Sequence, residues 1–409
     1  MRRTPVWAAA ILLLVSVSAM AQQPEQKPTA QPQSQKPIDW TYARKVYQKA
    51  HSGQALTDEE KACLERVKAE LHNRNPKSGT NAPRGPANSA NRPGAPTNMQ
   101  RPSVTPRDKT GLPPLCDMSA KDTYKGQNGG LYGDGQNDPP PSQLKAAQDA
   151  LAKVRNRDAN GKPSAGGKIV LMSVGMSNTM NEFGRFVGDI AQRTEKNAAV
   201  VVVNGAQGGQ TAGEWAKAES PVWQKAEERL KEANVTPPQV QVIWLKEAIG
   251  GPFRFGDFPK HAEQLKEFLI GDINQICQHY PNVQVIYLSS RIYGGYANRD
   301  LNPEPYAYES AYSVRWVIQD QIKGDPRLNF DPAKGEVKAP VLLWGPYLWA
   351  DGVTPRKSDG LTYEAREFAE DGTHPSHGAQ AKISTLLQKF FASELNAGWY
   401  TKGGRTDAQ

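Results

Sequence analysis

A serine, an aspartate and a histidine in this sequence have the types and spacing of an acyl-transfer site. Ser177 lies in a Gly-Met-Ser-Asn stretch directly after an apolar run, and Asp371 and His374 stand three residues apart in Asp-Gly-Thr-His-Pro near the C-terminus. A serine hydroxyl is a weak nucleophile unless a base accepts its proton and a carboxylate orients that base. Each motif alone is weak, because a serine after a strand is also a common helix cap. Together they predict a triad of Ser177, His374 and Asp371.

The segments that must position this triad alternate between short apolar runs and amphipathic stretches. The predicted strands are residues 168–174, 198–203, 240–245, 283–288 and 340–344, and the predicted helices are residues 181–194, 221–233, 261–280, 308–321 and 380–395. This alternation predicts a doubly wound α/β fold, a three-layer α/β/α sandwich with a five-stranded, mainly parallel, flavodoxin-like sheet. The site of such a sheet lies beyond the carboxyl ends of its strands. Because Ser177 follows the first strand, we expect it to face the loop that carries His374.

Further polar and aromatic residues follow the predicted strands and are candidate substrate-binding residues. They are Asn178, Asn204, Glu247, Arg291, Tyr293, Tyr347 and Trp349. The aromatic members would form flat apolar walls on which sugar rings stack, and the alternative is that some of them belong to the core.

The order of these motifs resembles the SGNH (GDSL-like) hydrolase superfamily over residues 168–391. Ser177 is similar to the nucleophile of the family's Gly-Asp-Ser block, with methionine in place of aspartate. Asn204 and Gly209 match its second block, and Asp371 and His374, followed by proline, match its last block. The resemblance implies that the backbone N–H groups of Ser177 and Gly209 donate to the oxyanion of an ester-cleaving serine hydrolase.

The third block of the family is absent. Where the family has an asparagine that donates to the oxyanion, the third predicted strand ends in Lys246 and Glu247. An ionised glutamate has no proton to donate. Either Lys246 replaces the missing oxyanion donor, or Lys246 and Glu247 form a salt bridge on the rim. Loss of one oxyanion donor typically lowers turnover by roughly 10²–10³.

The sequence gives no sign of a cofactor. Asp371, His374 and His377 could be interpreted as a metal site, but the triad explains the first two, so we expect no metal. The glycine-rich residues 129–135 follow no predicted strand and lack the spacing of a phosphate-binding loop, so we expect a surface turn beside the sheet, with contact to the site as the alternative. Cys63, Cys116 and Cys277 cannot form a disulfide framework, and a single Cys63–Cys116 bridge stays open.

The N-terminal quarter has a different composition from the rest. Residues 1–21 combine a basic start, an apolar run and small residues before position 22, which predicts a signal peptide cleaved near Ala21 and a secreted or periplasmic protein without a transmembrane anchor after cleavage. Residues 22–37 are predicted to be a disordered linker and residues 38–73 a helical hairpin, with a capping box formed by Thr57 and Glu60. Residues 74–112 are a second linker, and residues 113–397 form the hydrolase-like domain.

The net charge of +8 comes mainly from one segment. Between Arg74 and Lys109 there are seven basic residues and one acid, so the predicted domain is nearly neutral and has no basic face for nucleic acid. We therefore expect a secreted serine esterase, with an acetylated extracellular polysaccharide as the favoured substrate among possible esters. The alternatives are a non-hydrolytic carbohydrate-binding protein on the same fold and an envelope interaction protein that binds through its helical hairpin.

Overall fold

The computed structural model describes residues 42, 43, 46, 49, 56–74, 105–191 and 193–403. The chain divides into two compact units, Met1–Asn91 and Arg92–Gln409. The predicted signal peptide, the linker at 22–37 and most of the linker at 74–112 lie outside the described residues. Among the helices that are described, none has the length and apolar character needed to cross a membrane.

The N-terminal unit contains helix α2 (Asp58–Arg74). The preceding residues described as helical are Tyr42, Ala43, Val46 and Lys49. The predicted capping box forms: the Thr57 N–H donates to Glu60 Oε2 over 2.8 Å, and the Glu60 N–H donates to Thr57 Oγ1 over 3.3 Å. Glu60 also pairs with the Lys49 ammonium at 2.8 Å, which joins the preceding helical residues to the start of α2.

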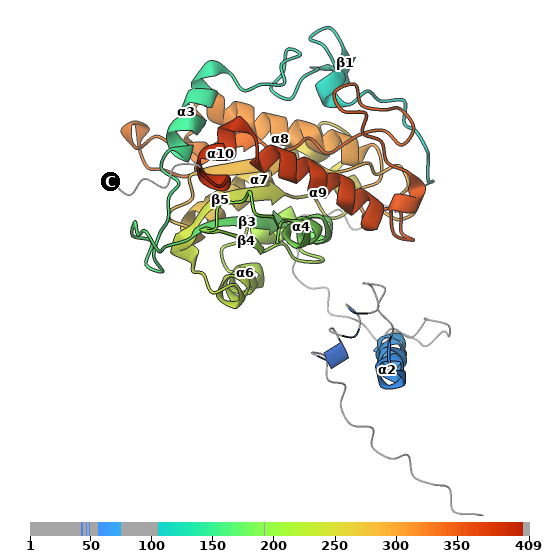
Figure 1. The fold of residues 1–409 in the computed structure, drawn as a ribbon. Helices are drawn as coiled ribbons and strands as arrows, with labels where there is room; N and C mark the ends of the chain where they lie inside the picture. Colours follow the sequence, from blue (N-terminus) through green and yellow to red (C-terminus); the bar gives the residue numbers. More distant parts are fainter. Residues whose placement is uncertain are drawn as a thin grey trace, which may run out of the picture. The chain divides into compact units, whose positions relative to one another are not determined.

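The second unit is built on a five-stranded parallel sheet (Figure 1). Its strands are β3 (Ile169–Gly175), β4 (Val200–Asn204), β5 (Val240–Lys246), β6 (Val285–Ser289) and β7 (Val341–Trp344). The strand order is β4-β3-β5-β6-β7, and every neighbouring pair is parallel. This confirms the predicted three-layer α/β/α fold. The chain passes from β3 to β4 and then back across β3 to β5, so the strand order reverses at the carboxyl end of β3.

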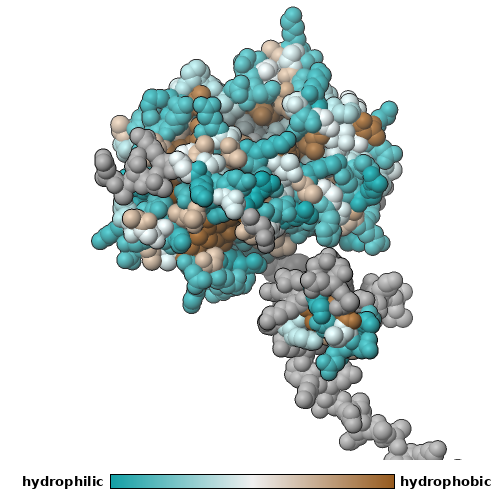
Figure 2. Space-filling view, viewed as in Figure 1, coloured by the Kyte–Doolittle hydropathy of each residue, from teal (hydrophilic) through white to brown (hydrophobic). Residues whose placement is uncertain are grey.

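Helices cover both faces of this sheet. The larger ones are α4 (Ser177–Ile190), α6 (Pro221–Glu232), α7 (Lys260–His279), α8 (Tyr306–Lys323) and α9 (His377–Phe391). Helices α4 and α9 pack on each other, and α7 packs on α8 on the opposite face, as right-handed crossovers require. Because both faces are covered, β3, β5, β6 and β7 are buried along their whole length, which explains their nearly continuous apolar sequence. In Figure 2 the outer surface is mainly hydrophilic, with apolar residues in small separate patches.

Several short elements were not predicted. They are the hairpin of β1 (Thr123–Tyr124) and β2 (Gln127–Asn128), helices α3 (Pro141–Leu151), α5 (Ala212–Trp215) and α10 (Glu394–Tyr400), and the 3₁₀ helices η1 (Leu115–Asp117), η2 (Pro237–Gln239), η3 (Pro252–Phe255), η4 (Pro326–Leu328), η5 (Pro332–Lys334) and η6 (Ala365–Glu367). The glycine-rich residues 129–135 pack beside the sheet, where the Leu131 carbonyl accepts from Trp344 Nε1 at 2.7 Å. The three cysteines are unpaired thiols.

Tertiary contacts extend the second unit beyond the predicted boundaries of 113–397. The Arg107 N–H donates to the Gly295 carbonyl at 2.7 Å, and its own carbonyl accepts from the Tyr293 hydroxyl at 2.9 Å. At the other end, Trp399 and Tyr400 are buried. The contact between Arg107 and Gly295 could not be predicted from the sequence, because it joins two backbone groups and leaves no pattern of residue types.

Candidate active site

The tight turn from β3 into α4 presents Ser177. Strand β3 ends at Gly175, and Ser177 is the first residue of α4. The helix was predicted to begin at 181, so it starts four residues earlier. A Cβ at position 175 would collide with the Lys246 carbonyl oxygen and the Thr179 side chain, so only glycine fits this turn. As the first helical residue, Ser177 has an N–H without an acceptor inside the helix, at the positive end of the helix dipole.

The structure brings Ser177, His374 and Asp371 into one hydrogen-bonded chain. His374 Nε2 lies 2.7 Å from Ser177 Oγ, and His374 Nδ1 lies 2.5 Å from Asp371 Oδ2. The other carboxylate oxygen of Asp371 accepts the N–H groups of Thr373 and His374, both at 3.0 Å. Burial acts to raise the pKa of Asp371, but these backbone donors and the imidazole outweigh it and lower the pKa. Asp371 therefore stays ionised and fixes the imidazole with Nε2 toward the serine.

The loop that carries Asp371 and His374 is held from two sides. The buried Asn178 donates from Nδ2 to the Thr373 carbonyl at 2.9 Å, which ties this loop to α4. Asn298 donates its N–H to the Asp371 carbonyl at 3.1 Å. Asn178 was predicted to contact substrate, and the structure instead shows its side-chain amide holding the histidine loop.

The loop after β4 brings Gly209 toward the same edge of the sheet. The Gln207 N–H donates to the Gly175 carbonyl at 2.8 Å, which ties this loop to the end of β3. Gly209 has a positive φ of 78°, and a Cβ there would meet no heavy atom within 4 Å, so this position borders open space. Asn204 accepts from Ser173 Oγ at 2.9 Å and donates to the Met180 carbonyl at 2.8 Å. Its side chain thus joins β3, β4 and α4, a positioning task that the sequence did not reveal.

Lys246 takes a different partner from either one expected. Its Nζ lies 2.8 Å and 2.7 Å from the two carboxylate oxygens of Glu182 on α4, and both side chains are completely buried. The structure thus corrects both expectations, because the ammonium is bound to Glu182 rather than directed at an oxyanion or at Glu247. Burial lowers the pKa of Lys246 to about 8, against the opposing effect of Glu182. Burial likewise raises the pKa of Glu182, against the opposing effect of Lys246.

Other charged side chains close to this pair are buried as well. Glu182, Lys246, Glu247, Asp272 and Arg291 are each at most 2% exposed, and we call them the buried charge cluster. Glu247 Oε1, both oxygens of Asp272, and Nε and Nη2 of Arg291 lack hydrogen-bond partners within the described part of the chain. Burial raises the pKa of Glu247 well above its usual range, and burial together with Glu247 does the same for Asp272. Glu247 and Arg291 therefore lie inside the protein and not on a substrate-binding surface.

The predicted aromatic walls are part of the core. Tyr293, Tyr347 and Trp349 are at most 5% exposed. The Tyr347 hydroxyl accepts from the Leu115 N–H at 3.1 Å, and Trp349 Nε1 donates to Glu304 at 2.7 Å. The expectation that these side chains bind sugars is thus corrected, because segments remote in sequence cover them.

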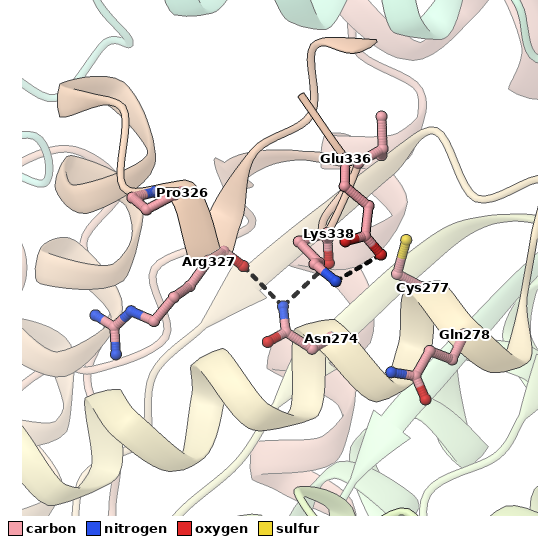
Figure 3. A pocket seen from close by; sticks show the side chains of 8 residues that line it. Asn274, Cys277, Gln278, Pro326, Arg327, Glu336 and Lys338 are labelled. Atoms are coloured by element: carbon pink, nitrogen blue, oxygen red, sulfur yellow. Dashed lines mark hydrogen bonds and ion pairs between the residues drawn. The ribbon is translucent and has the colours of Figure 1, made fainter. Parts of the chain in front are cut away.

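Two other parts of the described residues invite comparison with the triad: the histidines near the C-terminus and a cavity beside α7. No group of three or more His, Cys, Asp or Glu side chains within them is arranged to hold a metal ion, and His377 instead opens α9. A cavity of about 420 Å³ lies beside the C-terminal part of α7 (Figure 3), at the opposite end of the strands from Ser177. Its lining residues bond to one another: the Asn274 side chain donates to the backbone carbonyls of Arg327 and Lys338, and the Lys338 ammonium pairs with Glu336 at 2.6 Å.

Sequence reasoning missed Glu182 and Thr179. Both lie on α4 on the side that carries Phe183 and Phe186, and the buried Glu182 interrupts this apolar face. A carboxylate on an apolar helix face was a usable signal for a buried partner.

No protein-family profile matches the sequence, and no curated protein matches it. Similar solved structures include a proposed acylhydrolase from Bacteroides fragilis NCTC 9343, with 12% identity, coverage of 63% of this chain and 100% of that one, and a TM-score of 0.33. A carbohydrate esterase family 3 protein from Talaromyces cellulolyticus has 10% identity, coverage of 54% and 94%, and a TM-score of 0.32. An extracellular lipase from Streptomyces rimosus has 13% identity, coverage of 54% and 99%, and a TM-score of 0.29. Likenesses at this level do not assign an activity, which must come from the chain's own site.

Proposed function

We propose that this protein is a secreted serine esterase of the SGNH type that cleaves an ester by acyl transfer. The observation that carries the proposal is the unbroken chain from Ser177 Oγ through His374 to Asp371, with 2.7 Å and 2.5 Å between the bonded atoms. This arrangement gives the hydroxyl a base and gives the base a fixed tautomer, which are the two requirements of a serine nucleophile.

The reaction follows from the positions of these atoms. His374 Nε2 accepts the Ser177 proton while Oγ bonds to the ester carbonyl carbon, and Asp371 stabilises the imidazolium that forms. The tetrahedral oxyanion accepts the N–H groups of Ser177 and, by the family resemblance, of Gly209. Collapse breaks the bond to the alcohol, which takes the proton from His374. Water then attacks the acyl-serine by the same route, which releases the acid and restores Ser177.

For the substrate we propose an acetyl ester of an extracellular carbohydrate. Two features support it: the predicted signal peptide at residues 1–21, and the basic segment between Arg74 and Lys109, which suits an anionic polymer. The stacking argument no longer contributes, because Tyr293, Tyr347 and Trp349 are buried.

A non-hydrolytic carbohydrate-binding protein is the second candidate. It is favoured by one observation: Lys246 is bound to Glu182, so the side-chain donor of the family's third block has no replacement at this position. The triad argues against it, because binding alone does not require a serine hydroxyl hydrogen-bonded to a histidine.

Labelling and turnover of the purified mature protein test the proposal. A fluorophosphonate probe should label Ser177, and a panel of acetylated sugars and nitrophenyl esters of varied chain length should reveal turnover. EDTA should leave the rate unchanged, whereas loss of activity that a divalent ion restores would favour a metal site at His374 and His377. A folded protein that neither reacts with the probe nor hydrolyses any ester would support the binding protein instead.

A further inference from the structure

Lys246 contacts helix α4 at two points. Its carbonyl oxygen accepts from Thr179 Oγ1 at 2.5 Å, and its ammonium binds both oxygens of Glu182 at 2.8 Å and 2.7 Å. Thr179 and Glu182 are three residues apart and therefore lie on the same face of the helix. A single residue at the end of β5 thus holds the first two turns of the helix that begins with Ser177.

Two neighbouring contacts complete the support of this helix end. Gly175 pairs with Lys246 in the register of β3 and β5, and its missing side chain leaves room for the Lys246 carbonyl and Thr179 to meet. On the other side, Asn178 binds the Thr373 carbonyl at 2.9 Å. The start of α4 is therefore fixed between the end of β5 and the histidine loop.

The ion pair is a costly way to attach a helix. Removing two charges from water cancels most of their attraction, so a buried pair adds little net stability compared with apolar side chains of similar volume. Apolar contact already holds α4 one residue further on, where Phe183 stacks on Trp244 of β5 with ring centroids 5.4 Å apart. What the ion pair adds is one specific short contact between helix and strand, because any arrangement that separated the two buried charges would be strongly penalised.

We propose that Lys246 and Glu182 are positioning residues for the nucleophile: their buried ion pair sets the place of α4 so that Ser177 Oγ meets His374 Nε2. The kinetic part of this inference rests on the proposed esterase function, whereas the geometric part concerns the serine–histidine contact alone. A displacement of about 1 Å at a reacting group can cost on the order of 10²-fold in rate, so a small shift of α4 would be visible in turnover.

Four variants test the inference. Lys246→Met removes the ammonium and leaves Glu182 unpaired, which can unfold the protein. Glu182→Leu combined with Lys246→Met removes both charges at similar volume and should fold, as shown by thermal melting. Lys246→Arg keeps a cation that can bind both oxygens. The control is Lys266→Met with Asp320→Leu, which removes a pair at 2.9 Å between α7 and α8.

We expect kcat of the double variant to fall roughly 10- to 100-fold with little change in KM, because substrate binding is intact and alignment is lost. Lys246→Arg should recover most of the loss, and the α7–α8 control should keep wild-type kcat. A folded double variant with wild-type kcat would overturn the inference.

A second measurement does not depend on turnover. The ¹⁵N shift of His374 Nε2 in histidine-labelled protein reports its hydrogen bond with Ser177 Oγ, and Ser177→Ala supplies the reference for its loss. The double variant should move this signal to the Ser177→Ala position, and a wild-type signal in the folded double variant would contradict the inference. If the signal moves as expected but the wild-type protein cleaves no ester, the positioning role stands and the proposed function fails.

Discussion

The triad and the buried charge cluster differ in how exposed their polar atoms are and in how many of these atoms have hydrogen-bond partners. Asp371 and His374 side chains are 19% and 27% exposed, and the carboxylate, both imidazole nitrogens and the serine hydroxyl all have partners. The cluster is at most 2% exposed, and several of its atoms have no partner among the described residues. A partnered, partly solvated group changes protonation at little cost, whereas a buried charge is expensive unless it is paired. The comparison supports the proposed chemical role of the triad, and it agrees with the proposed positioning role of Lys246 and Glu182 within the cluster.

Replacing Ser177, the proposed nucleophile, should have the largest effect, a loss of activity with little loss of stability. Ser177→Ala should lower kcat by about three to six decades, because oxyanion and binding effects alone remain. Its melting temperature should stay close to wild type, since only one partly exposed hydroxyl is lost. Ester turnover and thermal melting check both halves, and full activity in this variant would rule out Ser177 as nucleophile.

The carboxylate that orients the histidine should have the next largest effect. Asp371→Asn keeps the shape but favours the wrong imidazole tautomer, so kcat should fall by up to about 10⁴, as in serine proteases. Steady-state kinetics on an activated ester measures this loss. Asn274→Asp, in the cavity of Figure 3, is a control at the other end of the sheet and should keep wild-type kcat. A loss below tenfold in Asp371→Asn would remove this residue from the triad.

Removing Arg291, one of the two cations of the buried charge cluster, should have its main effect on stability. Arg291 is 1% exposed and interacts electrostatically with four carboxylates, those of Glu182, Glu304, Asp371 and Glu247. Arg291→Leu leaves these carboxylates uncompensated and should lower the free energy of unfolding by about 3–5 kcal/mol. Urea denaturation measures it, with Arg327→Leu, an exposed arginine on η4, as the control expected to lose about 1 kcal/mol or less. Equal losses in the two variants would show that Arg291 is not essential to the cluster.

The smallest effect should be a gain in stability that depends on pH. The raised pKa of Asp272 means that the folded state holds a proton that the unfolded state releases above its ordinary pKa of about 3.9. Stability is therefore lost as pH rises from that value toward the folded-state pKa. Asp272→Asn removes this loss, so its stability relative to wild type should be higher at pH 8 than at pH 4.

Urea denaturation at the two pH values tests this gain. Asp149→Asn changes a carboxylate that is 59% exposed and paired with Lys145, and it should show no comparable dependence on pH. A constant difference between Asp272→Asn and wild type across this range would contradict the assignment of a buried, protonated Asp272.

The strands and the triad followed from local sequence. Five apolar runs lie within two residues of the observed strands, because a strand covered on both faces must be apolar along its length. Ser177 at the first strand end and His374 three residues after Asp371 were placed by the rule that parallel strands present their site at their carboxyl ends. The Thr57–Glu60 capping box was equally local, since both groups belong to one turn.

Long-range contacts decided the rest. The sequence shows a lysine at the end of β5 but does not show which carboxylate it binds. Its chain neighbour Glu247 was the expected partner, and only the packing of α4 on β5 makes Glu182 the partner. Tyr293, Tyr347 and Trp349 look like binding residues after strands, yet remote segments cover them and satisfy their polar atoms. Local periodicity and turn chemistry act over a few residues and can be recognised along the chain. The partner of a long or aromatic side chain depends on which elements the fold brings against it, and only the tertiary structure settles that.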